Sequence, residues 1–371
     1  MGGNKMDIKI EYKNSEGLFF EFIKKMTGKK VSVVCDVNTR PYADDLIKTI
    51  ETVATVTKTD FDIPELVPDE YVVETTYNNA KGCDYLLAVG SGSLNDVAKA
   101  VSTKLAIPCG VLATAASMDG YCSKGSALMR GGVKVTDEVH TPEDVLIDPD
   151  IIRKAPKLMT AAGFGDIVGK FTCLVDWKLS NIINGEKIHE KAYSMMQKAR
   201  TDCMDNFNDL VLYKPEAVSK LMDALIMAGI SMAECGNSRP ASGSEHHISH
   251  FLEMDFVRRG EKVPLHGVKV AIGTLISISL YNYLRDNKVE FKGAEEVYKL
   301  CDELPKESDV ALMLKAMGCP IRFSEIGVRR ETMEEAIEKA YTVRDRYTVL
   351  TLINQLGLTE KVKPMLMERF F

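Results

Sequence analysis

The feature that most constrains the fold is an alternation of short apolar runs and helical segments in the first 150 residues. Each run is short and mostly apolar, which is typical of a strand buried on both faces of a sheet. The alternation predicts a parallel sheet covered by helices on both faces. The expected strands are Val31–Asp36, Tyr85–Val89 and Pro108–Ala113, and the expected helices between them are Asp44–Thr55 and Ser93–Leu105.

After about residue 155 the pattern changes, and helical periodicity dominates. Segment 216–235 carries apolar residues at the spacing of one helix face, and segments 268–284, 294–304 and 333–340 also read as helices. A chain of 371 residues is too long for one ordinary domain. We therefore predict an α/β domain with a Rossmann-like parallel sheet over residues 1–155 and an all-α domain over residues 156–371. The boundary is expected between Asp148 and Ala162.

Composition and charge narrow the class of protein. Hydrophobic residues make up 45% and charged residues 27% of the chain, as in soluble globular proteins. The net charge is −6 and no run of Lys and Arg forms a basic stripe, so we expect no nucleic-acid partner. The N-terminal segment is polar and does not read as a signal peptide. The longest apolar stretch, Val270–Leu284, is too short to span a bilayer, so we expect no membrane insertion.

The nine cysteines are an odd number and are scattered without CxxC pairs. This pattern indicates reduced thiols rather than disulfides or a structural zinc site, and it favours a cytoplasmic location.

A turn rich in glycine and serine, Gly90–Asp96 (GSGSLND), follows the second predicted strand and opens a predicted helix. Such a turn lets backbone amides approach a pyrophosphate, and the helix N-terminus adds donors and the positive end of a dipole. The alternative is that the turn is only a tight connection between a strand and a helix.

The order of the candidate cofactor motifs is inverted. In the common dinucleotide fingerprint the glycine loop follows the first strand, and an acidic residue comes about 20 residues later. Here the acidic strand end, Asp36 with Asn38 and Thr39, comes first and the glycine turn follows. Asp36 could accept hydrogen bonds from a ribose and would repel a 2′-phosphate, which favours NAD over NADP. The alternative is that Asp36 caps the next turn.

Three of the six histidines lie within five residues, at His246, His247 and His250. On a helix, the first and third of these lie one turn apart on one face. His266 precedes an apolar helical segment, and Asp166 lies in AAGFGD, where small residues would let helices and ligands pack closely. Two imidazoles and one carboxylate suit a catalytic Zn²⁺, Fe²⁺ or Ni²⁺ ion. Spacing alone leaves open which histidines bind metal, and a histidine cluster without metal is the alternative.

Together these motifs resemble those of the dehydroquinate synthase and iron-containing alcohol dehydrogenase superfamily. Within it, the sequence is most similar to the sn-glycerol-1-phosphate dehydrogenases. The resemblance is carried by the inverted motif order and by the segments Thr114–Gly120 (TAASMDG), Gly163–Asp166 (GFGD) and Arg239–His246 (RPASGSEH). It implies an N-terminal cofactor domain, a helical C-terminal domain and an active site in the cleft between them.

The resemblance also implies roles for single residues. It assigns the metal to Asp166, His246 and His266, and it places Asp119 and His250 at the substrate. The cofactor contacts that we predict from the motifs and the resemblance are Asp36, Asn38, Gly90, Ser91, Gly92, Ser93, Asn95, Asp96, Thr114, Ser117 and Ser123.

Three positions depart from the family pattern or vary within it. Ser91 replaces a glycine seen in many relatives and could narrow the pyrophosphate pocket slightly. Cys122 lies between Asp119 and Ser123 and should not remove a binding group. His247 occupies a variable position, and we interpret it as helix surface or as a neighbour of the metal ligands.

The implied reaction is the reversible reduction of dihydroxyacetone phosphate to sn-glycerol 1-phosphate by NAD(H), with NADP(H) as the alternative cofactor. A metal would act as a Lewis acid on the carbonyl oxygen. His250 would bind the substrate or help to deliver the proton, and Asp119 would hold the terminal hydroxyl. Arg239 and Lys170 are candidate phosphate contacts, with surface salt bridges as the alternative.

Three other functions are open at this point: a glycerol or polyol dehydrogenase, a cyclase of the dehydroquinate synthase kind, and a non-catalytic nucleotide-binding regulator. The superfamily further suggests a homodimer or a larger homo-oligomer.

Overall fold

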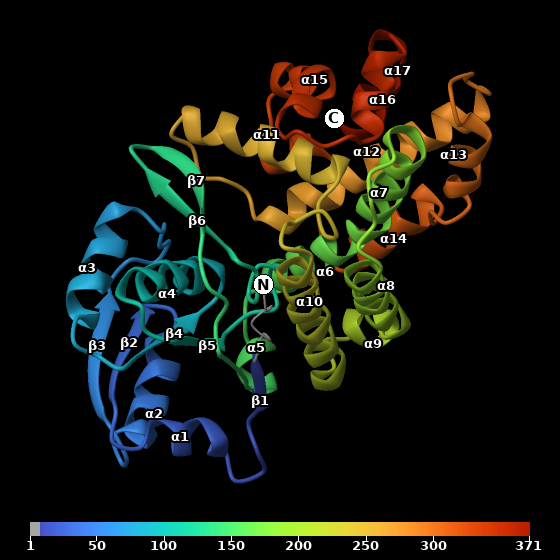
Figure 1. Cartoon of the computed structure of the whole chain (residues 1–371). Helices are drawn as coiled ribbons and strands as arrows, with labels where there is room; N and C mark the ends of the chain where they lie inside the picture. The colour runs from blue at the N-terminus through green and yellow to red at the C-terminus, as the bar shows by residue number, and fades with distance from the viewer. Residues whose placement is uncertain (1–7) are drawn as a thin grey trace. The chain divides into compact units, whose positions relative to one another are not determined.

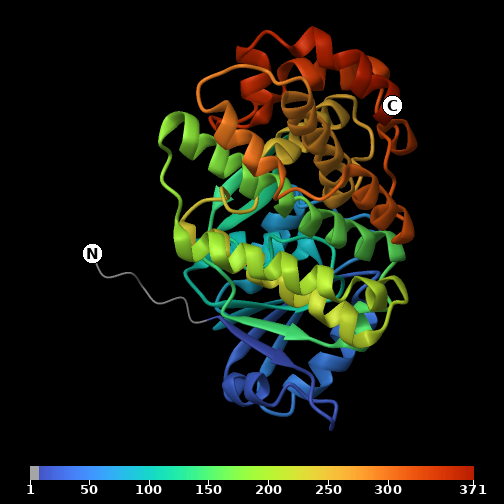
Figure 2. The ribbon, with the colours of Figure 1, turned by 90° about the vertical axis from the view of Figure 1, so that its right-hand side faces the viewer.

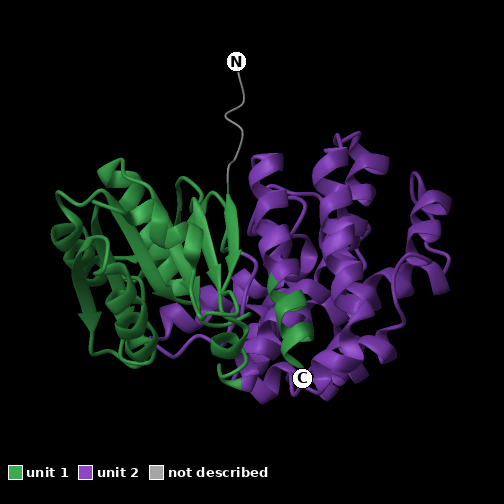
Figure 3. Cartoon of the chain, turned by 90° about the horizontal axis from the view of Figure 1, so that it is seen from below, with its two compact units in different colours: residues 1–116, 120–156, 213–222 green, residues 117–119, 157–212, 223–371 purple. Residues whose placement is uncertain are grey.

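A computed structural model of the protein describes residues 8–371. The chain divides into two compact units, which Figure 3 colours separately. The first unit comprises residues up to 116, residues 120–156 and residues 213–222, and the second comprises residues 117–119, 157–212 and 223–371. The predicted division of roles at residue 155 remains a prediction.

The first unit is built on a six-stranded parallel sheet with the strand order β1-β8-β5-β4-β2-β3. The three predicted strands are β2, β4 and β5, which lie next to one another in the sheet. Their residues are buried almost throughout, which explains their apolar runs. The strands are β1 (Lys9–Tyr12), β2 (Lys30–Asp36), β3 (Thr55–Phe61), β4 (Tyr85–Gly90), β5 (Cys109–Ala113) and β8 (Asp144–Ile147).

Helices cover both faces of this sheet, as predicted. Alternate residues of β2, namely Val31, Val33 and Cys35, pack in one core cluster with helices α1 and α2. Helices α3 and α4 contact the same strand, but none of their described residues belongs to that cluster, so they pack on the opposite face. The helices of this unit are α1 (Phe20–Met26), α2 (Arg40–Ile50), α3 (Glu70–Ala80), α4 (Gly92–Leu105) and α5 (Pro149–Ile152).

Two differences from the prediction have local causes. Helix α2 begins at Arg40 rather than Asp44, because Pro41 lies in its first turn, where proline needs no backbone donor. Between β5 and β8 the chain forms an unpredicted antiparallel hairpin of β6 (Gly125–Arg130) and β7 (Val133–Glu138). Its turn needs positive φ angles, which Gly131 and Gly132 supply at 56° and 73°.

The second unit is helical throughout its described elements, as Figures 1 and 2 show from two sides. The predicted α/β plus all-α architecture is therefore confirmed. Helix α10 (Pro215–Cys235) begins in the first unit and ends in the second. The other helices of the second unit are α6 (Lys157–Val168), α7 (Lys170–Asn184), α8 (Glu190–Asp205), α9 (Phe207–Val211), α11 (Ser244–Arg258), α12 (His266–Asp286), α13 (Ala294–Cys301), α14 (Glu307–Ala316), η1 (Phe323–Ile326), α15 (Arg330–Lys339), η2 (Ala340–Thr342), α16 (Val349–Gln355) and α17 (Thr359–Phe370).

Two helical stretches, Lys157–Asn184 and His266–Asp286, are long and apolar enough to cross a membrane by length and composition alone. The length argument made from Val270–Leu284 therefore does not hold, since the helix extends over 21 residues. The most apolar parts of the two stretches are 83% and 89% buried inside the structure, as in the core helices of globular folds.

Candidate active site

Three helices of the second unit bring one potential metal ligand each to a common point. Asp166 lies on α6, His246 in the first turn of α11, and His266 at the first position of α12. One ligand atom from each lies within 4.8 Å of the other two, and Asp166 Oδ1 is 3.6 Å from His246 Nε2. Ligand atoms about 2.1 Å from a tetrahedral metal ion would be about 3.4 Å apart. The donor set and its spacing therefore fit a divalent metal ion.

Small residues allow this convergence. A methyl group on Gly267 would lie 1.8 Å from the carbonyl oxygen of Ala162, and one on Gly165 would lie 2.5 Å from the carbonyl oxygen of Gly267. Helices α6 and α12 therefore touch backbone to backbone, next to Asp166 and His266. The close packing that the AAGFGD segment predicted is present, and glycine is the residue without a side chain in the way.

Burial sets the protonation states of the three residues. It lowers the pKa values of His246 and His266 well below the ordinary value, so both rings are neutral and offer a nitrogen lone pair. Burial, and secondly the charge of Asp119, raise the pKa of Asp166 to about 6, while Lys170 opposes this rise. A metal ion would favour the ionised form of this carboxylate.

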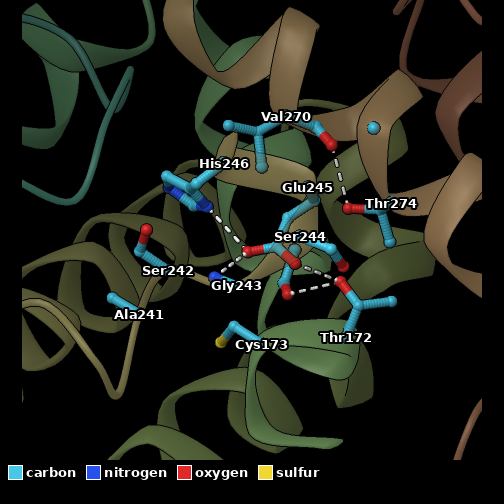
Figure 4. Close-up of polar contacts among 12 residues, drawn as sticks. Thr172, Cys173, Ala241, Ser242, Gly243, Ser244, Glu245, His246, Val270 and Thr274 are labelled. Carbon is cyan, nitrogen blue, oxygen red and sulfur yellow. Dashed lines mark hydrogen bonds and ion pairs between the residues drawn. The ribbon is translucent and has the colours of Figure 1, made fainter. Parts of the chain in front are cut away.

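Glu245 orients the imidazole of His246 (Figure 4). His246 Nδ1 lies 2.8 Å from Glu245 Oε1, so Nδ1 carries the proton and Nε2 is left to face Asp166. The carboxylate itself is held by the backbone N–H of Gly243 at 2.6 Å and by the hydroxyl of Thr172 at 2.6 Å. Because Glu245 is fully buried, water does not compete for these hydrogen bonds.

Lys170 holds two acidic residues of the site together. Its ammonium group lies 2.5 Å from Asp119 Oδ2, 2.9 Å from Asp166 Oδ1 and 3.0 Å from the carbonyl oxygen of Ala241. The backbone N–H of Asp119 also donates to Asp166 Oδ2 at 3.0 Å. Burial lowers the pKa of Lys170, but the two carboxylates outweigh it and hold the pKa above its ordinary value.

The surface salt bridge considered for Lys170 is therefore wrong, because the residue is fully buried. All three donor positions of its ammonium are in use, so a phosphate would have to displace one of these partners.

Arg239, the other predicted phosphate contact, is also buried, with only 3% of its surface exposed. It forms a two-pronged ion pair with Glu186 at 3.0 and 3.1 Å, and it donates to the carbonyl oxygens of Asp176 and Tyr347. Its charge is thus balanced within the protein. The alternative of a surface salt bridge is therefore partly wrong: Arg239 does form a salt bridge, but its guanidinium lies inside the fold.

The two other histidines of the cluster differ in their surroundings. His247 is fully buried and neither ring nitrogen has a partner among residues 8–371, and burial lowers its pKa to about 3. The helix-surface interpretation of His247 is therefore wrong. His250 Nε2 lies 3.2 Å from a guanidinium nitrogen of Arg344, and Nδ1 lies 3.4 Å from Glu253. Because Arg344 can only donate, Nε2 is the acceptor. The ring centre of His250 is 5.6 Å from that of His266.

The predicted cofactor residues of the first unit gather at the carboxyl ends of adjacent parallel strands. Asp36 ends β2, Gly90 ends β4, and Thr114 follows β5. The backbone N–H of Thr114 donates to the carbonyl oxygen of Gly90 at 3.1 Å, which links two of these ends. Ser91 is the N-cap of α4. Ligands of open parallel sheets bind beyond the carboxyl ends of the strands, so this edge suits a dinucleotide.

Asp36 caps the following turn, as its alternative interpretation predicted. Its Oδ1 accepts hydrogen bonds from the backbone N–H groups of Asn38 and Thr39 at 2.9 and 3.0 Å. This turn leaves Oδ2 for another donor, so a ribose contact by Asp36 stays a prediction. The side-chain amide of Asn38 donates to the carbonyl oxygen of Pro64 at 2.8 Å.

Other predicted cofactor residues bind the neighbouring loop or fall in another segment. Asn95 donates to the carbonyl oxygen of Tyr121 at 3.2 Å, and Asp96 accepts from the backbone N–H of Ala127 at 3.2 Å. Ser123 donates to the carbonyl oxygen of Gly120 at 3.0 Å. Ser117 lies in the short segment that belongs to the second unit. Cofactor contacts by these residues stay predictions.

Sequence reasoning did not single out Glu245, Arg344 or Arg346. Glu245 had a signal, because a carboxylate next to a candidate histidine ligand is placed to orient it. Arg344 had none, because it contacts His250 across 94 residues of sequence.

Comparison with known proteins identifies relatives along most of the chain. The sequence profile of the iron-containing alcohol dehydrogenases matches residues 14–156. The glycerol-1-phosphate dehydrogenase [NAD(P)+] of Halalkalibacterium halodurans is 32% identical, over 96% of this chain and 91% of that protein. The protein of the same name from Bacillus licheniformis is 32% identical, over 91% of this chain and 86% of its own.

Among solved structures, the iron-containing alcohol dehydrogenase of Corynebacterium glutamicum superposes with a TM-score of 0.71 at 17% identity. The superposition covers 97% of this chain and 95% of that one. This likeness concerns the fold alone.

Proposed function

The chain belongs to the glycerol-1-phosphate dehydrogenase family of iron-containing alcohol dehydrogenases, and we propose that it interconverts dihydroxyacetone phosphate and sn-glycerol 1-phosphate with NAD(P)(H). One observation carries the proposal: Asp166, His246 and His266 come from three helices to one point, in a chain related over most of its length to dehydrogenases of that name. In this proposal residues 1–155 bind the dinucleotide, and residues 156–371 hold the metal and the substrate.

Two bound groups supply the chemistry. A divalent metal ion held by Asp166, His246 and His266 would supply a Lewis acid for the carbonyl oxygen, and the nicotinamide would supply the hydride. Glu245 keeps His246 in the tautomer that presents Nε2. Zinc, nickel and iron all suit this donor set.

His250 is the proposed proton carrier. It lies one turn after His246 on α11, and its ring is close to that of His266. Nε2 has the lone pair, which accepts from Arg344 in this structure, so it can take the hydroxyl proton during oxidation and return it during reduction once Arg344 donates elsewhere.

Asp119 is the proposed contact to the terminal hydroxyl of the substrate. Lys170 holds its Oδ2, and the backbone N–H of Asp119 is held by Asp166, so the carboxylate is fixed before a substrate binds. A preorganised acceptor of this kind would help to set which face of the ketone receives the hydride.

We propose NAD(H) as the preferred cofactor because Asp36 would repel the 2′-phosphate of NADP(H). We further propose a cytoplasmic enzyme that acts on a small phosphorylated substrate as a homodimer or a larger homo-oligomer.

The test measures oxidation of NADH with dihydroxyacetone phosphate and with dihydroxyacetone, after metal removal and return of zinc, nickel or iron one at a time. We expect activity to depend on metal and to favour the phosphorylated ketone. A preference for dihydroxyacetone would instead indicate a glycerol or polyol dehydrogenase. Turnover without net change in NADH would indicate a cyclase, and full activity without metal would contradict the site.

A further inference from the structure

Two arginines near the end of the chain, Arg344 and Arg346, have no carboxylate within ion-pair distance among residues 8–371. Both side chains are half-buried. The lack of an ion pair distinguishes them from the phosphate contacts predicted from the sequence, because Arg239 is paired with Glu186 and Lys170 with two aspartates. Their positive charge is therefore not balanced by a direct ion pair.

The two guanidinium groups converge on one hydroxyl group. Arg344 donates to Ser238 Oγ at 2.9 Å and Arg346 donates to the same atom at 2.8 Å. Arg346 also donates to the carbonyl oxygen of Ser242 at 3.1 Å. Burial lowers the pKa of both arginines, and the charge of Arg344 contributes to a value of about 10 for Arg346. Two like charges held together away from water are unfavourable unless an anion joins them.

This pair of arginines lies beside the proposed catalytic residues. Arg344 donates to His250 Nε2 at 3.2 Å, and the ring of His250 is 5.6 Å from that of His266. Ser238 and Ser242, which hold the pair, lie in the segment between α10 and α11, the helix that carries His246. An anion bound here would therefore be next to the proton carrier.

We infer that Arg344 and Arg346 bind the phosphate group of the substrate, in place of Arg239 and Lys170. The inference rests on the proposed function. A phosphate monoester carries a charge between about −1.5 and −2 near neutral pH, which matches two guanidinium groups. The planar fork of each arginine can donate two parallel hydrogen bonds to phosphate oxygens. A phosphate that takes over the donor of Arg344 would also release the lone pair of His250 Nε2 for proton transfer.

A neighbouring pocket gives the inference a rival. Arg346 lines a pocket of about 560 Å³ together with Arg239, Lys187 and His189. An anion could bind in this pocket without taking part in the reaction. The experiment therefore has to separate phosphate binding as such from phosphate recognition in the substrate.

The test compares the wild type with Arg344→Gln, Arg346→Gln and Arg346→Lys, all loaded with metal and NADH. The matched control is Arg330→Gln, because Arg330 is 58% exposed on α15 and pairs with Glu334. Two quantities are measured: KM and kcat for dihydroxyacetone phosphate and dihydroxyacetone, and binding of inorganic phosphate by titration calorimetry. Metal content is measured for each variant, to show that the site is intact, and Arg346→Lys serves if a glutamine variant does not fold.

We expect each glutamine variant to raise KM for dihydroxyacetone phosphate about 10- to 100-fold, as when a charge-assisted hydrogen bond is lost. The preference for the phosphorylated over the unphosphorylated ketone should fall by a similar factor, and inorganic phosphate should bind more weakly. Arg346→Lys should retain part of the preference, because it keeps the charge but loses the fork. Arg330→Gln should match the wild type.

Two results would overturn the inference: an unchanged KM for dihydroxyacetone phosphate, or an equal loss of activity on both ketones. An unchanged KM together with weaker phosphate binding would place the anion in the pocket beside Arg346. If the wild type itself prefers dihydroxyacetone, the proposed function fails. The calorimetry then still decides whether Arg344 and Arg346 form an anion site. Unchanged phosphate binding in both glutamine variants would then exclude an anion site, and weaker binding would support one.

Discussion

Replacing Glu245 with glutamine tests whether Glu245 positions the metal ligand His246 or only supports the fold. Glutamine has the shape of glutamate, and its carbonyl oxygen can accept from His246 Nδ1 and from the N–H of Gly243, as Oε1 does now. Its amide group can donate to Thr172, whose hydroxyl then donates to the carbonyl oxygen of Gly169, which lies 3.1 Å away. Every buried hydrogen bond can therefore be kept.

The expected effect on metal binding comes from the lost charge. A hydrogen bond to a charged group contributes about 1.5–3 kcal/mol and a neutral one about 0.5–1.5 kcal/mol. The bond from His246 to Glu245 should therefore weaken by about 1.5 kcal/mol, which corresponds to roughly tenfold in affinity. Loss of a carboxylate behind a metal-binding histidine typically costs about 10- to 100-fold, so we expect metal to bind at least about tenfold more weakly.

The expected effect on folding has the opposite sign. Burial raises the pKa of Glu245, which means that the fold disfavours its charge. Neutral glutamine removes that cost, so the free energy of unfolding of the metal-free protein should stay equal or increase. The assay is a zinc titration against a competing chelator, together with urea denaturation of the metal-free protein. Glu307→Gln is the matched control, because the partners of Glu307 are Ser279 and Arg369, which are outside the site.

A wild-type dissociation constant for zinc in Glu245→Gln would refute this reasoning. So would a loss of metal affinity that is accompanied by an equal loss of folding stability, since that outcome would assign Glu245 to the fold. Glu307→Gln should leave the zinc affinity unchanged.

Three further predictions test other parts of the site. Asp166→Asn should purify without stoichiometric metal, and an unchanged metal content by elemental analysis would show that the ligand set is wrong. Gly267→Ala would place a methyl group 1.8 Å from the carbonyl oxygen of Ala162. It should destabilise the protein by about 1–3 kcal/mol in urea denaturation and reduce metal content, and a wild-type midpoint would contradict the close helix contact. Asp36→Ala should raise KM for NADH and shift the ratio of kcat/KM toward NADPH. If the ratio stays constant, Asp36 serves only the turn.

Three of the strands that are buried on both faces could be predicted, but β8 (DVLI), which is also buried throughout, was missed because it is only four residues long and begins with a charged residue. Strands β2, β4 and β5 read as apolar runs because no residue in their middle faces water. Strand β3 was missed because it is an edge strand, and only two of the seven residues of its sequence TVTKTDF are buried. The hairpin of β6 and β7 was missed for a related reason, since half or more of its residues are only partly buried or exposed.

The metal site could be predicted to the level of a histidine cluster and an acidic partner. Periodicity puts His246 and His250 on one face of a helix, but it does not say which of them faces Asp166. The resemblance made that choice. In the structure, the choice follows from where α12 crosses α11 and α6, which places His266 near both His246 and Asp166.

By itself, the sequence determined the order of the elements, the two-part architecture and the residue types that could bind metal and dinucleotide, because these depend on local pattern. It also showed which arginines and lysines lie near the motifs and could therefore bind a phosphate. Only the tertiary structure decided which of those cations are already neutralised, because the partners come from distant segments: Glu186 lies 53 residues before Arg239, and Asp119 lies 51 residues before Lys170. A positive charge can be read from a residue type, but the charge that opposes it depends on the fold.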